Sequence, residues 1–154
     1  MINGREIKEL QKTIHKLSEE MSILSDKLSS CTKILQDSYN SHEEAMVRGY
    51  ELGVVINVVD GDTFDVDILG NIERVRIIGI DAPERGQDGF FESGMHLTKL
   101  LGEKHHIVYL QRSGSNKDSW GRIRRIVWLE IPEDASVKSV GTLLVEAGHA
   151  VIVE

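Results

Sequence analysis

The chain has 154 residues, of which 40% are apolar and 28% are charged, a composition typical of one folded domain plus an accessory element. It has no run of eighteen apolar residues and its N-terminus is charged, so we expect no membrane span and no secretory signal, and the cytoplasm is favoured. A net charge of −7 argues against a protein that attracts polyanions through its overall field, so any such contact must be local.

Residues 7–35 repeat apolar side chains with a period of seven, which predicts an α-helical coiled coil. Isoleucine or methionine at one heptad position of the seam and leucine at the other favours a parallel coiled coil of two helices. The sequence therefore predicts a homodimer through residues 7–35. A long helix folded back on its own domain is the alternative. The only cysteine, Cys31, lies in the seam, either as a small apolar residue or as an interchain disulfide. The seam residues are Ile7, Leu10, Ile14, Leu17, Met21, Leu24, Leu28, Cys31 and Leu35.

From Leu52 the apolar period changes from seven to two, which indicates β-strands and marks a domain boundary. We therefore expect a coiled-coil helix over residues 1–42, a linker over 43–51 and a second domain over 52–154. The patterns in this second domain predict, in order, strands at 53–59, 63–69 and 72–80, a helix at about 91–103, strands near 105–112 and 122–130, and a helix at about 136–147 that stops at Gly148.

Five short strands with a helix after the third describe a small Greek-key barrel of the oligonucleotide-binding (OB) kind. The predicted fold class is α+β: a five-stranded OB-fold β-barrel with packed helices, preceded by an N-terminal α-helical coiled coil.

Carboxylates gather at the predicted ends of two neighbouring strands. Asp62 starts the second strand, where Gly61 allows a tight turn, and Asp81 ends the third. A hard cation such as Ca²⁺ takes carboxylate and carbonyl oxygens, and Pro83 biases Ala82 to an extended backbone that can leave its carbonyl free. Glu84 then lies close to the metal without binding it, where a general base for hydrolysis would sit.

Arginine suits the binding of a phosphate, because its planar fork makes two parallel hydrogen bonds and keeps its charge. Arg76 lies five residues before Asp81, and Arg122 follows a Trp-Gly turn, so both can converge on one phosphate. Residues 112–125 form a local basic stretch in an otherwise acidic domain. These acids and arginines together indicate a metal-dependent phosphodiesterase.

Three segments of the chain resemble the signature segments of the thermonuclease (staphylococcal nuclease) family, in the same order and at similar spacing. The resemblance covers about residues 52–154 and does not include the coiled coil. The three segments are Asp60-Gly61-Asp62-Thr63, Arg76-Ile77-Ile78-Gly79-Ile80-Asp81-Ala82-Pro83-Glu84 and Asp118-Ser119-Trp120-Gly121-Arg122.

The resemblance implies an OB-fold nuclease that cleaves DNA and RNA with one Ca²⁺ and leaves 3′-phosphate ends. It implies that Asp62, Asp81 and the Ala82 carbonyl bind calcium, and that Asp60 supports this shell. It also implies that Glu84 activates or orders the attacking water. Arg76 and Arg122 would bind the phosphate and stabilise its transition state.

The chain also departs from the family pattern. The loop Arg85 to Gly89 carries little positive charge, and the aromatic residues that contact substrate after the last apolar stretch have no counterpart. Trp120 stands where relatives commonly have tyrosine and could stack on a base. Arg124 and Arg125 are expected to be solvated or to steer phosphate, so with Trp120 they are our predicted substrate-binding residues.

Other interpretations remain open from sequence alone. Asp-Gly-Asp is most often a hairpin turn, and a single arginine on a strand is most often solvated. His105-His106 lacks a third spaced ligand and fits a surface strand start better than a metal site. The domain could be a catalytically weak OB-fold module that binds nucleic acid or protein on a coiled-coil scaffold, or the coil itself could be the functional part.

Overall fold

The computed structural model describes residues 3–102 and 107–153, and His105-His106 therefore lies outside the described residues. The chain divides after Glu43 into two compact units, each of which is described by itself below. No helix within the described ranges has the length and apolar character needed to cross a membrane.

The first helix, α1 (Gly4–Val47), begins with a reciprocal cap. The Asn3 side-chain oxygen accepts the Glu6 backbone N–H at 3.0 Å, and the Glu6 carboxylate accepts the Asn3 backbone N–H at 2.8 Å. Gly49, with φ of 82°, follows the last turn. Within the predicted linker over 43–51, α1 continues to Val47 and β1 begins at Tyr50. No glycine or proline interrupts residues 5–48, which explains why the helix does not end earlier.

The apolar seam of α1 is exposed in the single chain. Its isoleucine, leucine and methionine residues are each 47–71% exposed, and Cys31 is exposed as well. In a coiled coil a partner helix would cover this stripe. The oligomer itself stays a prediction.

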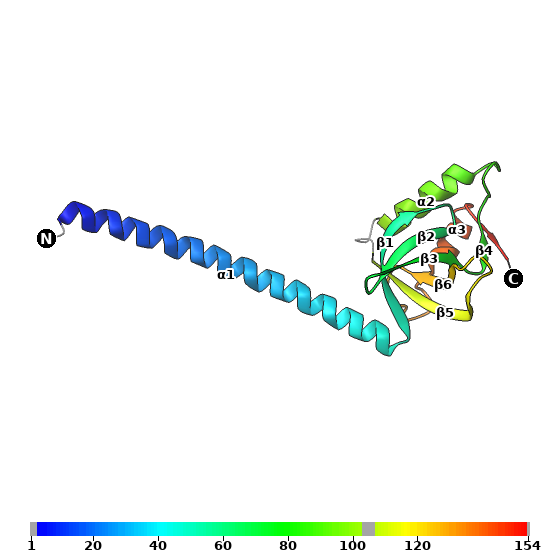
Figure 1. The fold of residues 1–154 in the computed structure, drawn as a ribbon, viewed down its shortest axis with the longest axis horizontal. Helices are drawn as coiled ribbons and strands as arrows, with labels where there is room; N and C mark the ends of the chain where they lie inside the picture. Colours follow the sequence, from blue (N-terminus) through cyan, green and yellow to red (C-terminus); the bar gives the residue numbers. More distant parts are fainter. Residues whose placement is uncertain (1–2, 103–106, 154) are drawn as a thin grey trace. The chain divides into compact units, whose positions relative to one another are not determined.

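The second unit is a closed five-stranded barrel, as the sequence predicted (Figure 1). Its strand order is β1-β2-β3-β6-β5, and β5 pairs with β1 to close it. β3 and β6 are parallel and every other barrel pair is antiparallel, which is the OB-fold arrangement. The barrel strands are β1 (Tyr50–Val58), β2 (Thr63–Ile68), β3 (Asn71–Ile77), β5 (Ile107–Lys117) and β6 (Ile123–Trp128).

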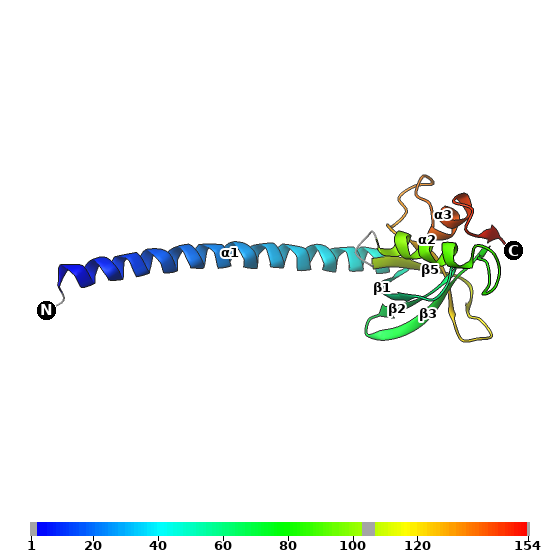
Figure 2. The ribbon, with the colours of Figure 1, turned by 90° about the horizontal axis from the view of Figure 1, so that it is seen from above.

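Alternation along the strands sends apolar side chains into the barrel. Phe64 and Val66 of β2 and Val75 and Ile77 of β3 are at most 1% exposed, as the period of two predicted. Two helices, α2 (Phe90–Gly102) and α3 (Val140–Glu146), pack side by side against the barrel (Figure 2). Leu97, Leu101 and Leu144 bring their apolar faces into the same core.

The predicted third strand, 72–80, is two strands in the structure. β3 ends at Ile77, and β4 (Ile80–Asp81) pairs with β7 (Val151–Ile152) in a separate two-stranded sheet. Gly79 between them has φ of 78°, a left-handed conformation that turns the chain out of the barrel. Asp81 therefore lies on a small sheet beside the barrel and not on a barrel strand.

Two other boundaries differ from expectation. The last helix begins at Val140 instead of about 136, because Asp134 accepts hydrogen bonds from the Ser136 N–H and hydroxyl and forms a local turn that competes with helix. Ser139 caps the helix, and Gly148 has the left-handed φ of 77° that was predicted. β5 continues to Lys117, so the turn before β6 is shorter than the expected 113–121.

A carboxylate bridges two arginines across β1, β5 and β6. Glu51 accepts Arg112 at 2.6 Å on one oxygen and Arg125 at 2.6 Å on the other. Burial acts to raise the pKa of Glu51, but the hydrogen bonds from Arg125 and Arg112 outweigh it and hold this pKa below its ordinary value. The charged form of Glu51 is therefore more stable in the folded protein than in the unfolded chain.

We expect Glu51→Gln to lower the free energy of unfolding by about 2 kcal/mol, because it leaves a buried guanidinium without its counter-charge. This loss of unfolding free energy should be complete above the ordinary Glu pKa of 4.5. It should disappear as the pH falls through the lowered pKa that Glu51 has in the folded state. Urea unfolding at pH 7 and pH 3 measures this. An equal loss at both pH values would show that the charge is not the cause.

Candidate active site

Asp62, directly before β2, is a buried acid that is only 6% exposed. Its Oδ1 accepts the Thr63 hydroxyl at 2.9 Å, and its Oδ2 accepts the Ala82 backbone N–H at 2.8 Å. Burial raises the pKa of Asp62, because desolvation disfavours the carboxylate more than the Ala82 N–H and the nearby Arg76 favour it. The carboxylate ties the start of β2 to the residue after β4.

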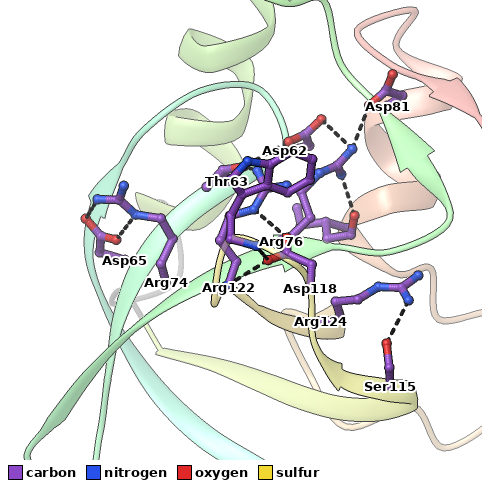
Figure 3. A network of polar contacts seen from close by, with 12 residues as sticks. Asp62, Thr63, Asp65, Arg74, Arg76, Asp81, Ser115, Asp118, Arg122 and Arg124 are labelled. Carbon is purple, nitrogen blue, oxygen red and sulfur yellow. Dashed lines mark hydrogen bonds and ion pairs between the residues drawn. The ribbon is translucent and has the colours of Figure 1, made fainter.

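The Arg76 guanidinium lies between Asp62 and Asp81 (Figure 3). Its Nη2 is 3.2 Å from Asp62 Oδ2 and 2.6 Å from Asp81 Oδ1. Its Nη1 donates to the carbonyls of Ile77 and Ile80 at 2.6 and 2.9 Å. Two carbonyls and two carboxylates thus hold the group in one position.

Arg122 reaches the same network from the turn before β6. Its Nε donates to Asp118 Oδ2 at 2.6 Å, and its Nη1 lies 3.4 Å from the Thr63 hydroxyl. Burial acts to raise the pKa of Asp118, but the Arg122 side chain and the backbone N–H groups of the turn hold it below its ordinary value. A continuous chain of contacts therefore runs from Arg122 through Thr63 and Asp62 to Arg76.

Gly61 is needed here for space. A Cβ at this position would lie 2.3 Å from the Ser93 hydroxyl of α2 and 2.7 Å from the Ala82 Cβ. Residues 60–62 form a bend between β1 and β2, and Gly61 adopts it without a left-handed φ, so what the structure requires of this glycine is the missing side chain. The glycine lets α2 and Ala82 pack directly on the turn that carries Asp62.

The structure places the other two predicted acids differently. The Asp60 carboxylate accepts the Asp62 backbone N–H at 3.1 Å, and its predicted support of a metal shell stays a prediction. Glu84 is exposed in the loop after β4, where its backbone N–H donates to the Gln87 side chain at 2.7 Å. Within residues 3–102 and 107–153, no hydrogen bond or ion pair joins the Glu84 carboxylate to the acids or arginines of the network.

The three predicted substrate-binding residues separate into two groups. Trp120 is 79% exposed, and the Arg122 guanidinium lies 5.2 Å from its ring centroid. Arg124 faces outward beside Arg76 in the β3–β6 register and donates to Ser115 at 3.0 Å.

Arg125 does not fit the predicted contact with substrate. It faces the barrel interior, is 2% exposed and pairs with Glu51, because β6 alternates and its neighbour Arg124 takes the outer face. Its guanidinium is part of the protein core.

Two residues of the network received no role from sequence, although both lie in the family-like segments. Thr63 links Asp62 to Arg122, and Asp118 holds the Arg122 side chain and the backbone of its turn. The four-residue spacing of Asp118 and Arg122 was the available indication. Nothing in the spacing of Thr63 predicted that its hydroxyl would bridge two charged groups.

The Asp62 and Asp81 carboxylates offer oxygens of the kind that a hard cation takes. Asp62 and Asp81 oxygens lie within 3.2 Å of the same Arg76 nitrogen, so the two carboxylates converge on one region. No group of three or more His, Cys, Asp or Glu that could hold a metal occurs in the described part of the chain. A Ca²⁺ ion here would need backbone carbonyl, water or substrate oxygens to complete its shell, which this ion accepts.

The comparisons with known proteins agree with this geometry. No family profile matches the chain. A protein named uncharacterized endonuclease from Escherichia coli is 34% identical over 103 residues, or 66% of this chain and 61% of that protein. The thermonuclease of Staphylococcus intermedius is 37% identical over 91 residues, or 54% and 51%, and the micrococcal nuclease of Shigella flexneri is 30% identical over 101 residues, or 64% and 56%.

These matches confirm the resemblance to thermonuclease-like proteins that the three segments predicted. The chain spans about half to three fifths of the length of the curated relatives it matches.

Asp62→Asn should stabilise the fold, because a neutral amide removes the cost of burying this carboxylate and still accepts the Ala82 N–H. We expect a rise of about 4 °C in Tm at pH 8 with a chelator present, the shift that about 1 kcal/mol gives a domain near this size. The gain should vanish as the pH falls below the ordinary Asp pKa of 3.8, where both the folded and the unfolded chain carry a proton.

Asp65→Asn, on β2 three residues after Asp62, is the matched control with the opposite sign. The hydrogen bond from Arg74 holds the pKa of Asp65 below its ordinary value, so its removal should lower Tm. A fall in Tm for Asp62→Asn as well would contradict the assignment of Asp62 as a destabilising buried charge.

Proposed function

We propose that this chain is a Ca²⁺-dependent nuclease that hydrolyses phosphodiester bonds of DNA and RNA and leaves 3′-phosphate ends. The observation that carries the proposal is the convergence of the Asp62 and Asp81 carboxylates on Arg76, with Arg122 joined to them through Thr63. The names of the matched relatives support a nucleic acid substrate.

Bound calcium would supply charge to polarise a phosphoryl oxygen and to orient water. Asp62, Asp81 and the Ala82 carbonyl are the residues that would hold it, and Asp60 would keep the Asp62 turn in place. α2 packs closely on this turn at Gly61, which would limit the rearrangement of the carboxylates when they bind.

Arg76 and Arg122 would bind the phosphate and stabilise the charge that grows on its oxygens in the transition state. Asp118 positions the Arg122 fork, and two carbonyls position the Arg76 fork. Glu84, exposed in its loop, would take a proton from the attacking water. Trp120 and Arg124 lie on the exposed side of this network and would contact the flanking nucleotides.

Arg76→Gln should lower the rate of single-stranded DNA cleavage on the order of 10²-fold or more, the usual cost of removing one transition-state stabiliser. Arg74→Gln is the matched control, since Arg74 lies on the same outer face of β3 but pairs with Asp65 outside the network. It should cleave like the unaltered chain.

The metal and the product ends are tested in the same digestion. Cleavage should need Ca²⁺, stop with a chelator and drop strongly in Glu84→Gln, and the products should accept polymerase extension only after phosphatase treatment. Equal digestion with and without chelator would contradict the proposed dependence on Ca²⁺. Tight binding of DNA without turnover at any Ca²⁺ concentration would select the binding module instead.

We also propose that α1 forms a parallel homodimer through residues 7–35, because its exposed seam has the period and residue types of a two-stranded coiled coil. In this arrangement residues 1–42 assemble the protein and residues 52–154 carry the nuclease site.

Sedimentation equilibrium of the full chain should give twice its mass of 17.3 kDa. Placing glutamate at two seam positions, Leu17→Glu with Leu24→Glu, should give the monomer, because it buries like charges in the interface. Ser22→Glu with Ser29→Glu, on the outer face of the same heptads, is the control and should stay dimeric. A monomer for the unaltered chain would exclude the coiled-coil dimer.

A further inference from the structure

A groove of about 530 Å³ lies between α2 and the end of β1. Val58 and Val59 form one wall, and Phe90, Phe91 and Met95 of α2 form most of the other. The groove is lined mainly by apolar side chains. None of the roles proposed above uses it.

The apolar side chains of this groove are unusually open to solvent. Phe91 is 77% exposed and Met95 is 73% exposed, one helical turn apart on α2. The ring of Phe90 packs edge-on against Phe91, with centroids 5.3 Å apart and planes at 74°, so the exposed ring is braced from one side. A braced, exposed aromatic ring is suited to stacking with another flat group.

The groove borders the turn that carries Asp62. Asp60 lines it, and the same residue accepts the Asp62 backbone N–H at 3.1 Å. α2 passes so close to this turn that a Cβ on Gly94 would lie 3.8 Å from the Asp60 backbone. The α2 wall of the groove is therefore held against this turn by close packing.

Positive charge is placed at the groove as well. Arg85 and Lys99 line it, in a chain whose net charge is −7. A flat apolar surface flanked by cations matches one nucleotide of a single strand, whose base has a π-face and whose backbone is anionic. A base paired inside a duplex could not present its face to Phe91.

We infer that this groove holds an unstacked base of the substrate strand next to the cleaved phosphate, with Phe91 as its stacking partner and Arg85 near its backbone. The inference rests on the proposed nuclease function and adds a preference for single-stranded substrate.

The test is a coupling measurement between Phe91 and single bases, with full-length Glu84→Gln in Ca²⁺. Fluorescence anisotropy gives Kd for a labelled single-stranded DNA of nine nucleotides and for versions with one abasic position, moved along the strand. Phe91→Ala should weaken binding of the intact strand about 10-fold, the usual scale of one stacked base. One abasic position, the one that removes the stacked base, should by itself weaken binding about 10-fold to the protein that keeps Phe91. For that strand Phe91→Ala should not weaken binding any further.

Two further variants make the result specific. Phe91→Trp should keep the affinity and the sensitivity to the abasic position. Ile72→Ala removes another exposed apolar side chain, 69% exposed on β3 and outside the groove, and should also keep both. Duplex DNA should bind with the same Kd whether residue 91 is Phe or Ala.

Failure of this inference is separable from failure of the proposed function. If the unaltered chain cleaves DNA but Phe91→Ala leaves Kd unchanged, or adds its loss independently at every abasic position, the groove does not bind a base. A change in sedimentation of Phe91→Ala with unchanged DNA binding would assign the groove to a protein contact and also overturn the inference. Absence of cleavage by the unaltered chain would count against the nuclease proposal alone.

Discussion

The buried carboxylate of Asp62 is the constraint on which the rest of the site depends. A charge with so little solvent contact must be surrounded by donors, and each donor here comes from a different part of the chain: the Thr63 hydroxyl, the Ala82 N–H after β4 and the Arg76 guanidinium of β3. Satisfying this one group brings together the segments that carry the other candidate residues. These donors do not fully offset the loss of solvent, so burial raises the pKa of Asp62.

Arginine side chains contribute to the stability of the barrel in one place and to the candidate site in another. The side of the strand on which each arginine lies decides between these two roles. Arg76 and Arg124 point outward from adjacent strands, while Arg125 points into the barrel and pairs with Glu51. Around the site the arginines are also fixed by acids, Arg122 by Asp118 and Arg76 by Asp81. A pre-positioned fork loses less entropy when it binds an anion than a free side chain does.

An acidic protein that acts on nucleic acid needs short-range attraction in place of a long-range field. The exposed rings of Trp120 and Phe91 and the outward-facing Arg124 are consistent with such local binding. Stacking does not depend on net charge, so aromatic contacts would suit the binding of a nucleic acid by a chain whose overall negative charge repels it.

The sequence alone determined the barrel and most of the site's composition. The apolar period of two predicted the barrel strands, and three separated segments indicated Asp62, Arg76, Asp81 and Arg122 together. It also predicted the long N-terminal helix α1, since a heptad pattern is local. Tertiary structure decided what depends on contacts between distant segments. Gly79 moved Asp81 onto a separate sheet, Gly61 proved necessary for the approach of α2, and the side of β6 on which Arg125 lies made it a core residue. Thr63 and the groove beside Phe91 became visible only when β2, α2 and the turn before β6 were placed together, because no local pattern records which side chains meet across the fold.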